Sequence, residues 1–221
     1  MSSCNRFDGP ACGLVHLSVG PRASRRVADP YPGAVTTPRP AGDRVFLDVA
    51  TAVLGPGDHR IADLLDVLAQ MPAGQVDVVH ANDDLLPRLA HENGLDAALS
   101  AARLALRPGG LFIAAVPELD KLRRLRPTAP PPRVSGRGEQ RQVTVQLWDW
   151  AEDGQSYGLE VLQLARSDRQ WELVRAVSTR HQVITGAQVT AGLTAAGFAA
   201  VQRLTPKESG HPLPLWVAVA P

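Results

Sequence analysis

Two short, largely apolar runs, residues 76–81 and 111–116, constrain the fold more than any other feature of the sequence. Each has the length and composition of a β-strand that is buried on both faces, as in a parallel sheet. Between them, apolar residues recur at helical spacing over 95–106, and the Pro-Gly-Gly at 108–110 ends that helix. A shorter stretch of helical spacing, 61–68, precedes the first run. Strand, helix and strand in this order predict an α/β fold with a parallel sheet.

The spacing of the apolar residues changes after residue 140. Residues 117–140 are rich in proline and glycine and are expected to form an exposed loop or lid. Beyond them, alternation of apolar and polar residues is typical of antiparallel strands. The elements expected there are strands near 143–147, 157–161 and 175–183, a helix at 186–196 ended by Gly197, and a closing strand at 213–220.

The composition excludes several classes of function. The 221 residues include 23 basic and 22 acidic residues, a formal net charge of +1, so the chain lacks the basic excess typical of nucleic-acid binders. No apolar run reaches the roughly 18–20 residues of a membrane span, and residues 1–13 contain no secretory apolar region. Cys4 and Cys12 are too few for a disulfide framework or a four-ligand zinc site. We therefore expect a cytoplasmic protein with no structural metal and no nucleic-acid or membrane partner.

The first turn of the parallel sheet is a candidate ligand site. Ligands of open parallel sheets bind beyond the carboxyl ends of the strands, next to a glycine-rich first turn. Residues 8–13, DGPACG, supply such a turn, and Asp29 follows where an acid could accept from ribose hydroxyls. Residues 47–51 are a rival first turn. Between 8–13 and Asp77 there is room for three strand-and-crossover units of roughly 20 residues, whereas after 47–51 there is room for one, so the spacing favours 8–13.

Several segments resemble a known family. VDVVHANDDLL at 76–86 and LRPGGL at 106–111 look like the fourth and fifth strands of class I S-adenosylmethionine-dependent methyltransferases. Four later segments are similar to small bacterial methyltransferases of the glycine N-methyltransferase type: QLWDW at 146–150, DGQSY at 153–157, AAGF at 195–198 and SGHP at 209–212. The resemblance covers residues 60–221 well and residues 8–59 weakly.

The resemblance implies a Rossmann-like sheet of seven strands, mostly parallel with the last strand antiparallel. An antiparallel insertion after the fifth strand would cover the active site. The chain would be one methyltransferase-like domain, 1–221, divided into a cofactor-binding half at 1–116, a loop and antiparallel insertion at 117–183, and a closing helix and strands at 184–221.

The cofactor implied by the resemblance is S-adenosylmethionine, together with a set of residues that would bind it. Those residues are Asp8, Gly9, Cys12 and Gly13 at the methionine end, Asp29 at the ribose, Asp63 near the adenine, and Asn82 and Asp83 where methyl donor and acceptor meet. The adenine position could instead fall on Thr51, depending on how the gap between Asp29 and Asp77 is filled. The first turn departs from the family pattern at Val15, where the family usually has another glycine.

A small acceptor molecule would bind under the insertion. A sulfonium cation is attracted to aromatic faces, so Trp148 and Trp150 are candidate neighbours of the transferred methyl group. In the glycine type a Tyr-Arg pair precedes the penultimate helix, but this sequence has His181-Gln182 there, and Arg180 could replace the arginine. His211 and His181 are the preferred candidates for a catalytic base, because imidazole titrates near neutral pH.

Ordinary structural roles compete with these assignments. The cluster Asn82-Asp83-Asp84 could merely cap a helix, and Trp148 and Trp150 could be core residues. A catalytically degenerate methyltransferase-fold protein, acting as a binding or partner subunit, is therefore the alternative to an enzyme that methylates nitrogen or oxygen of a small molecule. Whether the chain forms a homodimer or joins a partner is left open. A nicotinamide-dependent oxidoreductase is disfavoured, because no G-x-G-x-x-G follows a strand.

Overall fold

The computed structural model describes residues 41–221 except 73, 83, 120–121 and 168–169. The chain divides into two units, Met1–Pro38 and Arg39–Pro221, and every described residue belongs to the second. The predicted first turn at 8–13, the predicted acid Asp29 and Asp83 therefore lie outside the described residues.

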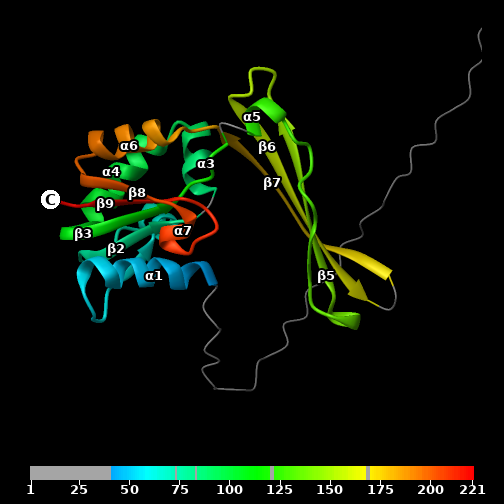
Figure 1. Ribbon diagram of the computed structural model, residues 1–221, viewed down its shortest axis with the longest axis horizontal. Coiled ribbons are helices and arrows are strands. Elements are labelled where there is room, and N and C mark those ends of the chain that lie inside the picture. Colours follow the sequence, from blue (N-terminus) through cyan, green and yellow to red (C-terminus); the bar gives the residue numbers. More distant parts are fainter. Residues whose placement is uncertain (1–40, 73, 83, 120–121, 168–169) are drawn as a thin grey trace, which may run out of the picture. The chain divides into compact units, whose positions relative to one another are not determined.

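The main sheet has the strand order β1-β2-β3-β9-β8 (Figure 1). Its strands are β1 (Ile61–Asp63), β2 (Val76–Ala81), β3 (Leu106–Ala115), β8 (Ala199–Leu204) and β9 (Leu215–Val219). β1, β2 and β3 pair in parallel, whereas β9 is antiparallel to both of its neighbours, β3 and β8. The expected mostly parallel sheet with an antiparallel last strand is confirmed, and the described residues supply five of the seven expected strands.

Helices cover both faces of this sheet. On one face lie α2 (Leu64–Ala69), α3 (Leu85–His91), α4 (Leu95–Ala105) and α6 (Gly186–Ala195), and on the other lies α1 (Ala41–Leu54). Helix α1 buries Phe46, Val49 and Ala50, which are spaced for one helical face, against Val78 and Ile113 of the sheet. The sequence did not predict this helix.

The alternative interpretation of residues 47–51 as the first turn is wrong, because these residues lie inside helix α1.

The helix predicted over 61–68 is also corrected. Its first part is strand β1, which pairs with β2, and only its second part forms α2. Asp63 ends β1 and caps α2, its Oδ1 accepting a hydrogen bond from the backbone N–H of Leu65 at 2.7 Å.

The Pro-Gly-Gly turn at 108–110 lies inside β3 as the structure defines it. Helix α4 ends at Ala105, as the turn predicted, but strand pairing with β2 already begins at Leu106 and is irregular before Leu111. Gly110 is required by close packing, because a Cβ there would lie 3.0 Å from the backbone oxygen of Asp77 in β2.

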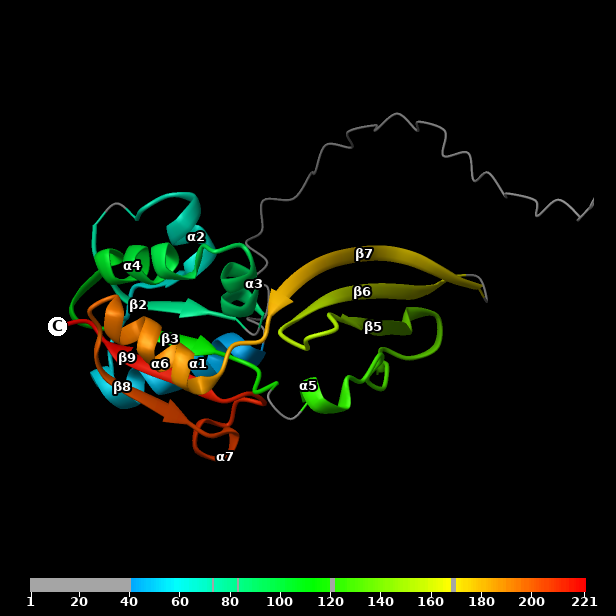
Figure 2. The same cartoon turned by 90° about the horizontal axis from the view of Figure 1, so that it is seen from above.

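A second sheet is inserted between β3 and α6, with the order β4-β5-β6-β7 and all neighbours antiparallel (Figure 2). Its strands are β4 (Arg133–Ser135), β5 (Gln142–Trp150), β6 (Ser156–Ser167) and β7 (Gln170–Gln182). The remaining short elements are α5 (Leu122–Leu125), the 3-10 turn η1 (Gly138–Gln140) and α7 (Pro206–Ser209). The predicted change to antiparallel strands after residue 140 is confirmed. Within the described part of the chain, no helix is long and apolar enough to cross a membrane.

Candidate functional site

Two predicted cofactor residues meet at the carboxyl ends of β1 and β2. Asp63 is paired in register with His80, and Asn82 follows β2. Nδ2 of Asn82 donates a hydrogen bond to Oδ2 of Asp63 at 3.4 Å, and Nδ1 of His80 lies 3.6 Å from the same oxygen. Neighbouring parallel strands thus bring together a carboxylate, an amide and an imidazole at the edge where ligands of such sheets bind.

His211, a predicted catalytic base, belongs to the same edge through ring contacts. The ring of Phe46 in α1 lies 5.1 Å from that of His80 and 5.6 Å from that of His211. His211 is buried, and its Nδ1 lies 3.1 Å from both the backbone N and O of Leu213. This local contact fixes the ring of His211 within its own loop.

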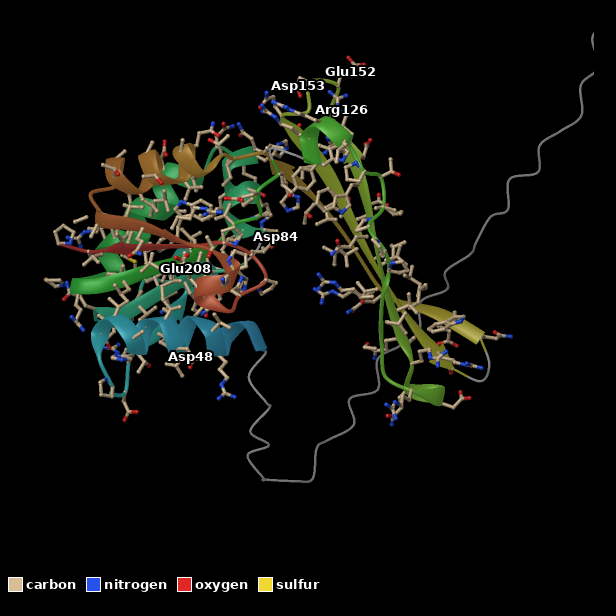
Figure 3. The ribbon with its side chains drawn as sticks, in the orientation of Figure 1. Asp48, Asp84, Arg126, Glu152, Asp153 and Glu208 are labelled. Carbon is tan, nitrogen blue, oxygen red and sulfur yellow. The ribbon has the colours of Figure 1, made fainter. Side chains whose placement is uncertain are left out.

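His181, the other predicted base, is fully buried on β7 and contacts an acid that the sequence did not single out. Its Nε2 lies 3.4 Å from Oδ2 of Asp84. Asp84 is labelled in Figure 3. The hydrogen bond from His181 holds the pKa of Asp84 below its usual range, against the opposing effect of burial. An ionised carboxylate only accepts hydrogen bonds, so Nε2 of His181 is the donor, and in the neutral form of the imidazole Nδ1 is then an acceptor. Among the described residues, Nδ1 of His181 has no hydrogen-bond partner.

The helix-cap interpretation of Asp84 can be decided from its contacts. Asp84 occupies the N-cap position of α3, but its side chain makes no capping hydrogen bond. The Asp84 carboxylate therefore contacts a buried histidine instead of capping α3.

The two predicted tryptophans join His181 in an aromatic stack. Register places Trp150, Tyr157 and His181 side by side on one face of the antiparallel sheet, with Trp148 next to them. The ring of Tyr157 lies 5.0 Å from the rings of both Trp148 and His181 and 5.1 Å from that of Trp150. Burial, and secondarily the charge of Asp84, raise the pKa of Tyr157 well above its usual value, so it remains a neutral phenol.

One further polar atom of this stack is buried without a hydrogen-bond partner in the described part of the chain. It is Nε1 of Trp148, whereas Nε1 of Trp150 donates to the backbone oxygen of Pro127 at 2.8 Å. A buried polar group without a partner costs about 1–3 kcal/mol. Two such atoms, an acceptor on His181 and a donor on Trp148, therefore favour a polar ligand at this aromatic face.

Arg180 does not share a face with the tryptophans. Arg180, Gly158 and Asp149 are opposite one another in the strand ladder, on the face of the sheet that points away from His181. With Glu160 they line a hollow of about 230 Å³. Arg180 thus points to the face opposite that of the tryptophans, although Trp148 also lines this hollow, and Trp150 lines a smaller one of about 80 Å³ with Arg180 and Tyr157.

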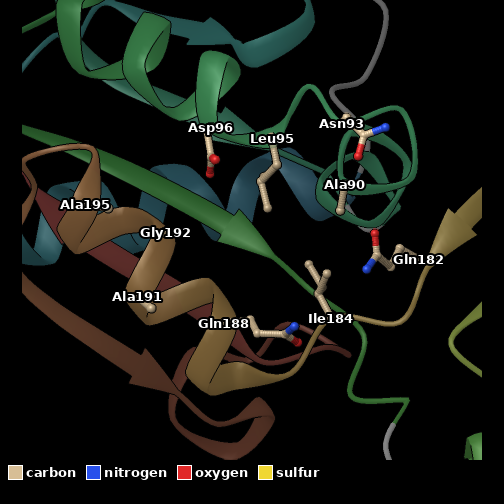
Figure 4. A pocket seen from close by; sticks show the side chains of 10 residues that line it. All are labelled: Ala90, Asn93, Leu95, Asp96, Gln182, Ile184, Gln188, Ala191, Gly192 and Ala195. Carbon is tan, nitrogen blue, oxygen red and sulfur yellow. The ribbon is translucent and has the colours of Figure 1, made fainter.

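A hollow of about 580 Å³ lies beside the main sheet, between the α3–α4 turn and α6 (Figure 4). It is lined by Ala90, Asn93, Leu95, Asp96, Gln182, Ile184, Gln188, Ala191, Gly192 and Ala195. None of the predicted site residues lines it. Across residues 41–221, apart from the gaps given above, no group of three or more His, Cys, Asp or Glu side chains could hold a metal ion.

The site residues that the sequence did not assign are Phe46, Tyr157 and Asp84. Tyr157 and Asp84 lie within segments that carried the family resemblance, but neither segment indicates which of its side chains is buried. Phe46 could have been found from its helical spacing with Val49 and Ala50.

No family model and no curated protein matches the sequence. Solved structures do match. An S-adenosylmethionine-bound amino pentose methyltransferase from Micromonospora echinaspora superposes with a TM-score of 0.59 at 15% identity, over 81% of this chain and 91% of that one. DesVI from Streptomyces venezuelae gives a TM-score of 0.52 at 18% identity, over 67% of this chain and 60% of that one.

A sugar N-methyltransferase from Streptoalloteichus sp gives a TM-score of 0.51 at 17% identity, over 66% of this chain and 57% of that one. This chain therefore spans only somewhat more than half the length of the last two proteins. At these identities the likeness establishes the fold and not the activity. The described residues have the fold of S-adenosylmethionine-dependent methyltransferases.

Proposed function

We propose that this protein transfers a methyl group from S-adenosylmethionine to a nitrogen or oxygen atom of a small molecule. The observation that carries the proposal is the aromatic face of Trp148, Tyr157 and His181, with its two unpartnered polar atoms. The fold supports the same function. The solved structures of similar fold do not support the alternative of a catalytically degenerate protein.

The described residues fit part of the cofactor. Asp63 and Asn82 offer an acceptor and a donor at adjacent strand ends, which suits the adenosine moiety. Aromatic rings near a carboxylate, here Trp148 and Tyr157 near Asp84, suit a sulfonium cation. When bound, the cofactor supplies a methyl group that is already activated for displacement.

Other parts of the cofactor site remain predictions, because the structure does not describe the residues concerned. They are Asp8, Gly9, Cys12, Gly13, Asp29 and Asp83, together with the two further strands of the expected seven-stranded sheet. The similarity to the glycine N-methyltransferase type also remains a prediction.

The protein's own part in the reaction is to position the acceptor and to take up a proton. An acceptor that starts as an ammonium group must lose a proton before its nitrogen can be methylated, and a hydroxyl group must lose one as its oxygen is methylated. Nδ1 of His181 is the proposed recipient, and the ionised Asp84 at Nε2 stabilises the resulting imidazolium. His211 remains an alternative base. Tyr157 and His181 are buried, which limits the access of water to this part of the face.

An amine is the first acceptor class to test. The similar proteins named for their substrates act on amino sugars or sugars. An amino sugar offers N–H and O–H donors for Nδ1 of His181 and oxygen acceptors for Nε1 of Trp148, so that one ligand could satisfy both atoms. The arginine that would bind the carboxylate of an acceptor such as glycine is replaced in this sequence, and Arg180, its candidate substitute, points to the opposite face of the sheet from His181.

Calorimetry of the full-length protein with S-adenosylmethionine and S-adenosylhomocysteine tests the proposal. We expect binding of both, and weaker binding by Asp63→Asn, which retains an oxygen to cap α2 but loses one acceptor. Asp66→Asn, at an exposed position of the same helix, is the matched control. No binding heat from either nucleoside would overturn the proposal. Cofactor binding without methyl transfer to amino sugars, glycine or simple amines would favour the degenerate alternative.

A further inference from the structure

The antiparallel sheet has a second face, opposite the aromatic stack, which we call the outer face. Residues opposite one another in a strand ladder point to the same side of the sheet, so the strand register shows which residues belong to the outer face. The core of the outer face is formed by Val134, Val143, Val145, Leu162, Leu164 and Leu173. All of these side chains are aliphatic, and they come from all four strands.

No layer of the described chain covers the outer face. Val134 is 61% exposed, Leu173 57% and Trp171 at its margin 45%. None of the residues of the outer face belongs to the hydrophobic clusters formed by the described residues. A sheet with one apolar face is stable when that face is buried, and contiguous exposed apolar patches usually mark interaction sites.

The charges along β6 indicate which partner fits. On the outer face this strand presents, in order, Glu160, Leu162, Leu164 and Arg166. Within the described part of the chain neither Glu160 nor Arg166 forms an ion pair, and Nε of Arg166 is buried without a hydrogen-bond partner. If two copies of β6 lie antiparallel, the acidic residue of each faces the basic residue of the other, and leucine faces leucine.

We propose that the outer face is an interface with a second copy of this chain, in which the two β6 strands cross antiparallel and face to face. A two-fold axis that passes between Leu162 and Leu164 sets Glu160 of each copy opposite Arg166 of the other. Two sheets packed in this way lie about 10 Å apart and cross at about 30°.

The geometry allows these charges to meet. Glu160 and Arg166 lie three residues on either side of the axis, about 10 Å at the usual strand rise. A crossing angle of about 30° displaces the opposed ends by about 5 Å, which two long side chains can span. Glu160 also borders the hollow of about 230 Å³ that is lined by Asp149 and Arg180, so its carboxylate lies next to open space. This proposal is independent of the proposed function, because it uses no residue of the aromatic stack.

Sedimentation equilibrium of the full-length protein tests the interface. We expect a dimer of the 23.6 kDa chain. Glu160→Arg and Arg166→Glu should each weaken the dimer by about tenfold or more, and the double variant should recover most of the loss. Within one chain the two residues are about 20 Å apart, so recovery requires contact between copies. Leu164→Arg should give a monomer, whereas Gln163→Arg, on the other face of the same strand, should not.

The test has clear contrary outcomes. A wild-type protein that is monomeric at tens of micromolar would overturn the proposal. A double variant no stronger than the single variants would do so as well, and would favour a different protein or another segment as the occupant of the outer face. Far-ultraviolet circular dichroism and the melting temperature of each variant separate loss of the dimer from loss of the fold.

Discussion

Asp84 and His181 lie 97 residues apart in the sequence, yet Oδ2 of Asp84 is 3.4 Å from Nε2 of His181. Asp84 lies between β2 of the main sheet and α3, and His181 lies near the end of β7 in the inserted sheet. The pair therefore joins the half of the fold expected to bind the cofactor to the insertion expected to cover it. It also fixes the tautomer of the only histidine in the aromatic stack.

The first prediction concerns Asp84→Asn. The amide preserves the size of the side chain but cannot stabilise a charged imidazole, so the methyl-transfer rate at saturating cofactor should fall by about a hundredfold or more, a larger factor than the loss of cofactor affinity. Single-turnover kinetics with saturating S-adenosylmethionine, together with calorimetry, measure the two quantities. A rate equal to that of the wild type would remove the pair from catalysis.

The second prediction concerns the dependence of stability on pH. Asp77 in β2 accepts hydrogen bonds from the Arg107 guanidinium and from the backbone N–H of Arg60, and these contacts, the first most of all, hold its pKa below the usual range. A lowered pKa in the folded state adds stability that is present above the unfolded pKa of about 3.9 and is lost as pH falls through the folded pKa.

Urea unfolding of wild type and Asp77→Asn should therefore differ at pH 7 and converge as the pH falls below about 4. Asp48→Asn, on the exposed side of α1 (Figure 3), is the matched control and should unfold like the wild type at every pH. A difference between wild type and Asp77→Asn that persists unchanged at acid pH would contradict an electrostatic origin.

Much of this fold could be predicted because its signals are local. The strand over 76–81 and helix α4 show their burial directly in the order of apolar residues. The residues of strand β8 do not by themselves indicate a strand, since most of its side chains are exposed and leave no apolar run. Helix α1 was obscured by the prolines that precede it, although its apolar residues have helical spacing.

The candidate site was predictable only in part, for a different reason. The sequence identified Asp63, Asn82 and His181, but contacts across many residues, such as that between His181 and Asp84, leave no mark in spacing. One relationship between neighbouring residues was also predictable. Arg180 and His181 are adjacent on a strand, so the alternation of side chains already assigns them to opposite faces.

The third prediction tests the packing at the start of β3. A Cβ at position 110 would lie 2.9 Å from the oxygen of Arg107 and 3.0 Å from that of Asp77, both of them backbone atoms. Gly110→Ala should therefore lower the free energy of unfolding by about 1–3 kcal/mol. Gly57→Ala is the control, because the atom nearest to a Cβ at that position is a side-chain carbon of His59, 3.9 Å away. If the two variants are equally stable in urea, β2 and β3 can move apart at this point without loss of folding free energy.

The fourth prediction sets stability against function at Trp148. Trp148→Phe keeps an aromatic ring to pack on Tyr157 but removes the buried N–H that has no partner among the described residues. If that N–H serves only a ligand, its loss leaves stability unchanged or raises it by up to about 1 kcal/mol, while the acceptor KM rises by about tenfold. Trp150→Phe should behave in the opposite way, because its N–H donates to Pro127 and its loss leaves a backbone oxygen without that bond. Urea unfolding and steady-state kinetics of both variants distinguish the two roles, and a Trp148→Phe protein that loses stability but keeps its acceptor KM would show that the ring is there only for packing.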